Sequence, residues 1–304
     1  MKQYLVLDLG GTQIKYGILN EEGVILNKGN IPSRVDSLEH LLEDMAEINN
    51  IVQAPYQAVA VSMPGRIDTD KGISCTGGSF KFLLNHNFQK DLEDIFSLPV
   101  TIANDAKCAA AGELWKGSMQ GVENAAVLTI GTGLGGSIIL NHQVYMGNTL
   151  NAGEFSLIPT NYEKVYDLDY SAFMFSHVST SALVQYYAQK KNVDKKEVNG
   201  IQIFDAYESG EKEALESVNT LAKNVAIFIF TLQCVLDLEV YAIGGGISAR
   251  SYLFKCIDRH MDELFEKINL SGISLNKPEV VPCAFKNDAN LIGALYFHLK
   301  HSAV

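Results

Sequence analysis

The chain has 304 residues, of which 47% are hydrophobic and 19% charged. It can therefore form one large or two ordinary domains with a full apolar core. Its formal net charge of −11 argues against nucleic acids and anionic membranes as partners, because both bind positively charged surfaces. The five cysteines are scattered, without a CxxC pair, a pattern typical of reduced thiols rather than of disulfides or a zinc cluster.

Neither an export signal nor a membrane span is expected. The apolar run at the N-terminus is short and is broken by Asp8, unlike a signal peptide. No apolar stretch approaches the ~18–20 residues that a transmembrane helix needs. The nearest is 226–240, which we interpret as a buried helix that enters a strand. We therefore expect a cytoplasmic protein.

The first half of the chain alternates between apolar runs and glycine or polar turns. Two runs separated by Gly10-Gly11 predict a pair of strands, and a third strand begins after a polar turn. Leucines spaced at helical intervals predict a helix that precedes a buried strand ending at Pro64-Gly65. A short helix, a strand and an alanine-rich helix follow. The predicted strands are 4–9, 14–19, 24–26, 57–62 and 99–103, and the predicted helices are 37–50, 89–97 and the one that starts near Asp105.

The second half opens with the same arrangement as the first, which indicates an internal duplication of structure. Strand 125–130 meets the glycine turn 131–136, and two further short strands follow. Segment 159–200 is the least regular, with a solvated turn expected at 190–197. The remaining predicted elements are a long helix at 213–235, a strand at 238–243 that runs into three glycines, a helix at 250–267 and a closing helix at 288–300.

The turn Asp8-Leu9-Gly10-Gly11-Thr12 is the first candidate phosphate site. Two glycines between strands expose backbone N–H groups and let a phosphate approach closely. Thr12 adds a hydroxyl, Asp8 could hold Mg²⁺ through water, and Lys15 lies near the same turn. The alternative is an ordinary hairpin turn.

The second glycine turn, Gly131-Thr132-Gly133-Leu134-Gly135-Gly136, matches the GxGxxG dinucleotide fingerprint. That fingerprint requires a helix directly after the glycines. A strand-like run, SIILNHQVYM, follows here, so the pattern favours a second phosphate loop on a hairpin over a dehydrogenase.

Asp105 is the candidate catalytic base. A carboxylate at the start of an alanine-rich helix lies at the positive end of the helix dipole, which favours its charged form, and it could accept a proton from an attacking hydroxyl. The alternative is that Asn104 or Asp105 only caps the helix.

Two further motifs have candidate ligand roles. Gly244-Gly245-Gly246 could let adenine or ribose approach the backbone, or could simply form a tight turn into a helix. Glu154, in Ala152-Gly153-Glu154, could accept hydrogen bonds from sugar hydroxyls or could be a solvated loop residue.

The order of these motifs is more specific than any one of them. It also includes Pro64-Gly65-Arg66-Ile67-Asp68, between the first turn and Asn104-Asp105-Ala106. From Asp8 to the closing helix, the chain resembles the ROK family of sugar kinases and repressors, within the actin/hexokinase-like ATPases.

The resemblance implies an α/β protein with an actin-like (ribonuclease H-like) fold of two domains and a cleft. We assign 1–118 with 288–304 to a small N-terminal domain, and 119–287 to a larger one. ATP and Mg²⁺ would lie against the turns at 8–12 and 131–133, with adenosine near 244–246. The sugar would contact Gly65, Asn104, Asp105 and Glu154, and the assembly would be a homodimer. Family repressors carry an N-terminal helix-turn-helix domain, for which no room remains before Asp8.

Two departures from the family pattern bear on the substrate. Leu157 stands where many members have a histidine that contacts sugar and a structural zinc, and no cysteine lies between Cys108 and Cys234. The resemblance therefore implies no zinc site. Phe175 aligns with a further sugar-binding glutamate.

These apolar replacements suit a substituent on O1 of the sugar, since sugar faces stack on aromatic rings. Candidates nearby are Tyr162, Tyr166, Tyr170 and Phe173. The pattern resembles the β-glucoside kinase branch and predicts phosphorylation of the 6-hydroxyl of a glucose unit, as in cellobiose. A divergent glucokinase or other hexose kinase (for mannose, fructose or N-acetylmannosamine) and a non-catalytic sugar sensor are the alternatives.

Overall fold

The computed structural model describes residues 2–302, and their contacts divide the chain into two compact units. The first unit comprises the described residues up to Gly121, His142–Ala152 and those from Asn287 onward. The second comprises Val122–Asn141 and Gly153–Lys286. The predicted domain limits differ from these units in that they place 119–121, 142–152 and residue 287 in the larger domain. The assignment of folding domains stays a prediction.

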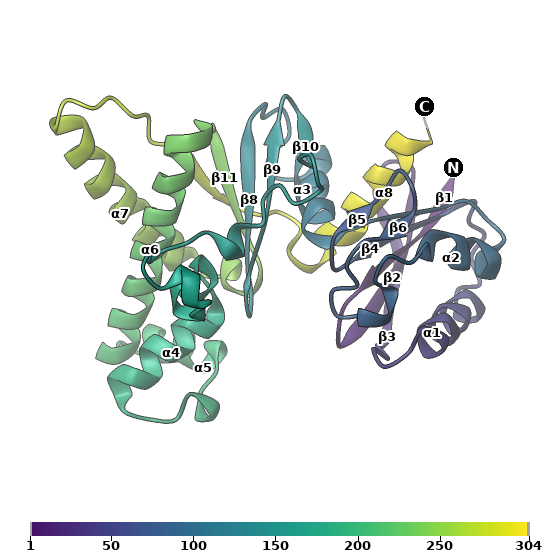
Figure 1. Ribbon diagram of the computed structural model, residues 1–304, viewed down its shortest axis with the longest axis horizontal. Helices are drawn as coiled ribbons and strands as arrows, with labels where there is room; N and C mark the ends of the chain where they lie inside the picture. Colours follow the sequence, from purple (N-terminus) through teal and green to yellow (C-terminus); the bar gives the residue numbers. More distant parts are fainter. Residues whose placement is uncertain (1, 303–304) are drawn as a thin grey trace. The chain divides into compact units, whose positions relative to one another are not determined.

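The sheet of the first unit has the strand order β3-β2-β1-β4-β7 (Figure 1). Its strands β1, β2 and β3 are antiparallel, whereas β1, β4 and β7 are parallel. The register places Asp8 opposite Ser62, and Met63 opposite Asn104. Three parallel strands therefore end at one edge of the sheet, where ligands of α/β proteins commonly bind. The strands are β1 Gln3–Leu9, β2 Gln13–Asn20, β3 Ile25–Pro32, β4 Val59–Met63 and β7 Val100–Asn104.

Helices cover both faces of this sheet (Figure 1). On one face, buried residues of α1 and α2 share a core with the strands. On the other face, α8 packs on β1, β4 and β7 and runs beside α3. A Cβ atom on Gly293 would lie 1.7 Å from the carbonyl oxygen of Cys108, so the close α3–α8 packing requires glycine. The elements are α1 Leu38–Ile51, α2 Phe88–Phe96, α3 Asp105–Lys116 and α8 Ala289–His301, with β5 Ile67–Asp68, β6 Ile73–Ser74 and the 3₁₀ turn Lys81–Leu83 at the periphery.

The second sheet repeats the strand order of the first, as β10-β9-β8-β11-β12. Strand β8 is antiparallel to β9 and parallel to β11, which is parallel to β12. This repeat confirms the predicted duplication of structure. A strand, β9, follows the glycine turn, so the dehydrogenase alternative is wrong. The strands are β8 Ala125–Ile130, β9 Leu134–Leu140, β10 Gln143–Tyr145, β11 Val240–Gly244 and β12 Glu279–Pro282.

Helix α6 is central to the second unit, where it packs against α4, α5 and α7. Segment 159–200, predicted as irregular, contains α4 and several short 3₁₀ turns. Helix α4 was missed because its apolar residues do not follow a helical stripe. The helices are α4 Thr180–Lys191, α5 Gly200–Glu208, α6 Lys212–Leu236 and α7 Ser251–Leu270, and the 3₁₀ turns are Phe155–Leu157, Val165–Asp167, Tyr170–Ala172, Met174–Ser176, Lys195–Glu197, Gly246–Ala249 and Lys286–Asp288.

By length and composition alone, α6 is long and apolar enough to cross a membrane. The expectation that no stretch approaches that length is therefore wrong. Its apolar window is 50% buried within the structure, and residues such as Leu221, Val225, Phe228 and Ile229 belong to the core of the second unit. These contacts identify α6 as a core helix, in agreement with the predicted buried helix at 226–240.

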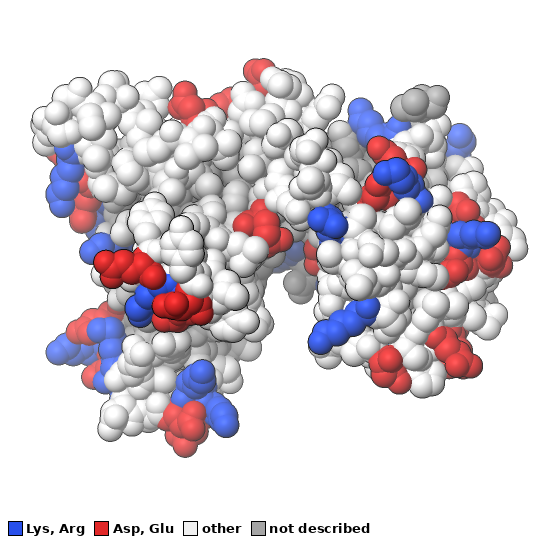
Figure 2. Space-filling model, viewed as in Figure 1, with Lys and Arg blue, Asp and Glu red and all other residues white. Residues whose placement is uncertain are grey.

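Charged side chains of both signs are interspersed on the face shown in Figure 2. Over the lower end of the second unit, where α4 and α5 lie in Figure 1, lysines and acidic residues are neighbours. The ion pairs Lys190–Glu216 and Lys191–Glu211 are examples, each with an N–O distance of 2.8 Å. The described part of this face thus presents no continuous basic stripe of the kind that binds nucleic acid.

Candidate active site

Asp8, at the end of β1, is a buried carboxylate with three side-chain partners. Its Oδ1 accepts hydrogen bonds from the Ser62 hydroxyl and from Nδ2 of Asn290, both at 2.9 Å. Its Oδ2 forms an ion pair with Nζ of Lys15 at 3.2 Å. Only 6% of Asp8 is exposed. Its ionised form is compensated by these donors, because a buried charge needs such partners.

The turn after Asp8 is held mainly by backbone contacts. The amide of Gly10 donates to the carbonyl of Gln13, and the amide of Ser33 donates to the carbonyl of Thr12, both at 3.0 Å. A Cβ atom on Gly11 would lie 3.0 Å from Oγ of Ser79. The turn therefore keeps a bare backbone surface that a phosphate could approach.

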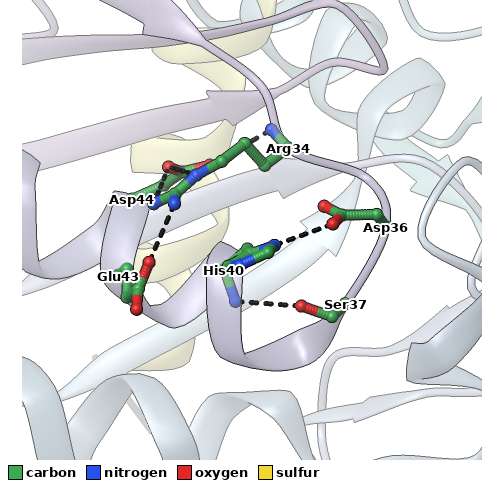
Figure 3. A network of polar contacts seen from close by, with 6 residues as sticks. All are labelled: Arg34, Asp36, Ser37, His40, Glu43 and Asp44. Carbon is green, nitrogen blue, oxygen red and sulfur yellow. Dashed lines mark hydrogen bonds and ion pairs between the residues drawn. The ribbon is translucent and has the colours of Figure 1, made fainter.

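An ion-pair network anchors the chain directly after Ser33 (Figure 3). Arg34 donates from its side chain to Oδ1 of Asp44 at 2.6 Å and from its backbone amide to Oδ2 at 3.2 Å. The same guanidinium contacts Glu43 at 2.8 Å. These acceptors raise the pKa of Arg34, with Asp44 as the main cause. Because Ser33 contacts Thr12, this network fixes the strand–helix connection beside the first glycine turn.

Asp105 is the first residue of α3, and the residue before it is the helix cap. Oδ1 of Asn104 accepts the amide of Lys107 at 3.0 Å. Oδ1 of Asp105 accepts the amide of Ala106 at 2.8 Å and Nδ2 of Asn104 at 2.9 Å. Of the two capping alternatives, the structure assigns the cap to Asn104. Asp105 then lies in the first turn, where backbone amides and the helix dipole favour its carboxylate form.

Gly65 joins Asn104 and Asp105 in one cluster. Nδ2 of Asn104 donates to the carbonyl of Gly65 at 2.8 Å. Gly65 has a φ of +97°, and a Cβ atom there would lie 2.0 Å from the carbonyl oxygen of Thr76. Only glycine fits both constraints. Three of the four residues predicted to contact the sugar are therefore brought together in the first unit.

The pKa of the Cys108 thiol depends on the charges at this edge of the sheet. Its thiol is fully buried, and burial raises its pKa well above the usual value, with the carboxylates of Asp105 and Asp8 adding to the effect. A hydrogen bond with Ser62 acts in the opposite direction. Both candidate carboxylates thus act electrostatically on one buried side chain.

The glycine turn of the second unit follows β8 and lies beside the start of α4. Within the turn, the amide of Gly131 donates to the carbonyl of Gly133 at 3.0 Å. The amide of Thr180 donates to the carbonyl of Gly131 at 2.8 Å, and the hydroxyl of Ser181 donates to the carbonyl of Thr132 at 2.7 Å. Among the described residues, backbone groups and the hydroxyl of Ser181 hold this turn.

The three glycines after β11 are neighbours of that turn. Gly244 pairs with Thr129 across the β8–β11 ladder. Gly245 has a φ of +87°, and a Cβ atom on it would lie 2.3 Å from the carbonyl oxygen of Ile130. Gly246 has open space at its Cα. Two glycine segments more than 100 residues apart in sequence thus share one edge of the second sheet.

A pocket of about 540 Å³ opens next to this edge. It is lined by Thr132, by Phe175, by residues 179–182 at the start of α4, and by Lys195 and Lys196. It therefore combines a turn backbone, hydroxyls, an aromatic ring and two cationic side chains. A pocket of this size suits a small ligand.

Glu154 belongs to the second unit, whereas the Gly65–Asn104–Asp105 cluster belongs to the first. Its Oε1 accepts a hydrogen bond from the hydroxyl of Ser156 at 2.6 Å. Leu157, two residues later, is 58% exposed. Phe175 is partly buried against the core and stacks on Phe173 with ring centroids 6.4 Å apart.

The loop between residues 159 and 173 is closed by its own backbone. Pro159 and Phe173 form a β-bridge, and the amide of Thr160 donates to the carbonyl of Ala172 at 2.7 Å. Within residues 2–302, no group of three or more His, Cys, Asp or Glu side chains is arranged to hold a metal ion. Three tyrosines of this loop are largely exposed, namely Tyr162, Tyr166 and Tyr170.

Sequence patterns did not identify Ser62, Asn290 or Lys107 as site residues. Ser62 lies in a continuous buried strand, and Asn290 lies about 280 residues after Asp8, so no motif links them. Lys107 is 3% exposed, and its Nζ contacts the carbonyl of Ala152. The one signal in the sequence is that Lys107 is a charged residue within an alanine-rich helix.

Comparisons with known proteins agree with this geometry. A model of the ROK family matches residues 4–301. A β-glucoside kinase of Klebsiella pneumoniae is 30% identical and aligns over 95% of this chain and 93% of its own. A glucokinase of Halalkalibacterium halodurans is 28% identical over 95% of this chain and 93% of its own.

A solved structure shows the same fold over the whole chain. The ROK family protein of Streptococcus pneumoniae, crystallised with sucrose, superimposes with a TM-score of 0.87 at 25% identity and covers 99% of each chain. This agreement confirms the predicted α/β fold of the ROK sugar kinases, which are actin-like ATPases. With a family model that spans nearly every residue, the chain belongs to the ROK family.

Proposed function

We propose that this chain is an ATP-dependent kinase that phosphorylates a sugar hydroxyl, with Asp105 as the catalytic base. The observation that carries the proposal is the cluster of Asp105, Asn104 and Gly65 at the edge of the sheet that also ends in Asp8. The names of the aligned relatives support a carbohydrate kinase.

The nucleotide phosphates are proposed to lie against the turns at 8–12 and 131–133. Both turns present backbone without bulky side chains, as phosphate loops do. Adenosine would lie near Gly244–Gly246, beside the pocket that includes Thr132. Lys15 would contact phosphate oxygens as a point charge.

Asp8 fits a role toward Mg²⁺. Carboxylate oxygens are the hard donors that Mg²⁺ prefers, and Mg²⁺ keeps most of its water shell. Asp8 Oδ2, which faces Lys15, would hold the cation through water. Bound Mg²⁺ would neutralise charge on the β- and γ-phosphates.

In the proposed reaction, Asp105 takes the proton of the sugar hydroxyl while the hydroxyl oxygen attacks the γ-phosphorus. The bond to the β-phosphate oxygen breaks, and ADP leaves with that electron pair. Asn104 orients the Asp105 carboxylate through its Nδ2. Glu154 would accept hydrogen bonds from other hydroxyls of the sugar. Positioning and charge compensation supply most of the catalysis in such transfers.

For the acceptor, we propose the 6-hydroxyl of a glucose unit within a β-glucoside such as cellobiose. Leu157 and Phe175 occupy positions where family members offer polar partners to the anomeric end of the sugar. Leu157 is largely exposed and Phe175 belongs to an aromatic stack, so both can contact an apolar or stacked aglycone. The alignment with a β-glucoside kinase supports this choice.

Glucose itself is the second candidate acceptor. The alignment with a glucokinase is nearly as extensive as that with the β-glucoside kinase. Mannose, fructose and N-acetylmannosamine complete the panel of acceptors to compare.

An ADP-coupled assay with Mg²⁺ and ATP tests the proposal. Cellobiose and aryl β-glucosides should give a higher kcat/KM than free glucose, and the phosphate should be found on O6. A higher kcat/KM for free glucose would identify glucose, rather than a β-glucoside, as the acceptor. No ADP above background with any sugar, together with sugar binding, would instead indicate a sensor.

Three other expectations stay proposals: a homodimer, a cytoplasmic location and no bound zinc. Light scattering of the purified protein measures the first, and fractionation of its source cells measures the second. Metal analysis that finds about one zinc per chain would contradict the third.

A further inference from the structure

The two oxygens of Asp8 have different surroundings. Oδ1 faces the protein and accepts two neutral donors, Ser62 from β4 and Asn290 from the first turn of α8. Oδ2 faces Lys15, whose side chain is 37% exposed. One oxygen is therefore fixed by donors from two other elements, and the other is paired with a partly exposed cation.

We propose that Ser62 and Asn290 are positioning residues that hold Asp8 in the rotamer required for Mg²⁺·nucleotide. The two donors fix Oδ1, so that Oδ2 is directed toward Lys15 and the incoming cation. This inference rests on the proposed kinase function, and it adds two residues that act through Asp8.

The packing of α8 explains why Asn290 can reach Asp8. Gly293, one turn after Asn290, lies against the backbone of Cys108 in α3, where any Cβ atom would collide. Gly112 of α3 makes the reciprocal approach, with a Cβ position 2.6 Å from the carbonyl oxygen of Ala289. Helix α8 therefore contacts both the helix that starts at Asp105 and the carboxylate of Asp8.

The hydroxyl hydrogen of Ser62 is donated to Oδ1 of Asp8. Ser62 is completely buried, so water cannot replace this donor. Loss of either donor leaves Oδ1 under-satisfied and frees the carboxylate to rotate.

Two substitutions remove these donors, namely Asn290→Leu, which keeps the branched shape and the number of heavy atoms, and Ser62→Ala, which removes one oxygen. Each should weaken binding of a Mg²⁺-loaded non-hydrolysable ATP analogue by roughly 10-fold, the effect of losing one hydrogen bond to a charged group. In EDTA, which removes Mg²⁺, the dissociation constant of the same analogue, measured by calorimetric titration, should change by less than about 2-fold, because Asp8 then holds no cation. In turnover, KM for Mg·ATP should rise while KM for the sugar stays unchanged.

Asn287→Ala is the matched control, because Asn287 is an exposed asparagine three residues earlier. It should leave every constant unchanged. Gly293→Ala is the structural comparison, and it should lower the melting temperature and affect nucleotide and sugar binding alike. If Asn290→Leu folds poorly, Ser62→Ala still tests the proposal, because it removes a single oxygen.

Equal losses of metal-loaded and metal-free nucleotide binding in both variants would overturn the positioning role. Wild-type affinity for the metal-loaded analogue in both would overturn it too. If the wild-type protein binds no Mg²⁺·nucleotide, both the proposed function and this inference are refuted. If it does bind Mg²⁺·nucleotide, the variants test the inference alone.

Discussion

The two sheets repeat one strand order, and backbone contacts hold the glycine turn beside each, yet the side chains next to the two turns differ. In the first unit, charged and amide side chains converge on Asp8 beside the turn. In the second unit, the turn at 131–133 is held by backbone groups and by the hydroxyl of Ser181. The first turn therefore lies beside a charged, hydrogen-bonded carboxylate, whereas the second turn has open space at the Cβ positions of Gly131 and Gly133.

The largest expected effect falls on the first unit. Asp105→Ala should lower kcat by ~10²–10⁴-fold, the usual contribution of a general base, with sugar and nucleotide binding retained. Single-turnover kinetics with the best acceptor sugar measure it. Asp70→Ala, a change to a carboxylate whose side chain is 88% exposed, should leave kcat unaltered. Near-normal turnover of the Asp105 variant would exclude it as the base.

The second expected effect tests the glycine surface of the second unit. Gly245→Ala would place a methyl group 2.3 Å from the carbonyl oxygen of Ile130, in a backbone conformation with positive φ. It should destabilise the protein by at least about 2 kcal/mol, through left-handed strain and overpacking. Thermal and urea unfolding measure the loss.

Gly246→Ala is the control for that change, since nothing lies within 4 Å of its Cβ position. It should cost little stability but could still obstruct nucleotide. Equal stability losses in the two variants would mean that close approach to β8 is not what requires Gly245.

The repeated succession of strand, glycine turn and strand along the chain could be predicted from the sequence because it depends on local patterns. Apolar runs ended by glycine or polar turns mark β1, β2, β8 and β9, and the strand after Gly136 separates the chain from dinucleotide-binding proteins. Leucine spacing marks α1 in the same way. The positions of Asp105 and both glycine turns followed from these elements.

Residues that act through tertiary contacts could not be predicted in this way. Asn290 reaches Asp8 only because Gly293 lets α8 approach α3, and neither residue forms a local motif with β1. Ser62 is one polar residue in a buried strand, and its role depends on the register between β1 and β4. Helix α4 was also missed, because its apolar residues form no helical stripe, although Ser179 caps its start.

A smaller effect is expected where side-chain support of the second turn is removed. Ser181→Ala deletes the hydrogen bond to the carbonyl of Thr132, worth about 1 kcal/mol. The KM for ATP should rise severalfold, with kcat and sugar KM unchanged. Thr220→Ala, which deletes a similar bond to the carbonyl of Glu216 on α6, is the control. An unchanged KM for ATP would show that backbone contacts alone hold the turn.

The smallest effect concerns acid sensitivity, which should differ between the units. His298 of α8 is 5% exposed and bonds to the hydroxyl of Thr101 at 2.9 Å. Burial lowers its pKa, and the nearby His301 adds to the effect. The folded state therefore favours the neutral ring, and its stabilising contribution is complete above the unfolded pKa of about 6.5. That contribution is lost as the pH falls from there toward the lower folded pKa.

Melting temperatures between pH 7.5 and 5 should therefore fall less steeply for His298→Gln, which keeps a polar side chain but does not titrate. His177→Gln, in the second unit, should keep the wild-type slope. The main contacts of α8 are all with elements of the first unit. As the pH falls, amide hydrogen exchange should therefore rise in the first unit before it rises in the second. An identical pH slope for His298→Gln and wild type would remove His298 as the source of that difference, and would leave the carboxylates of the first unit as the groups to test.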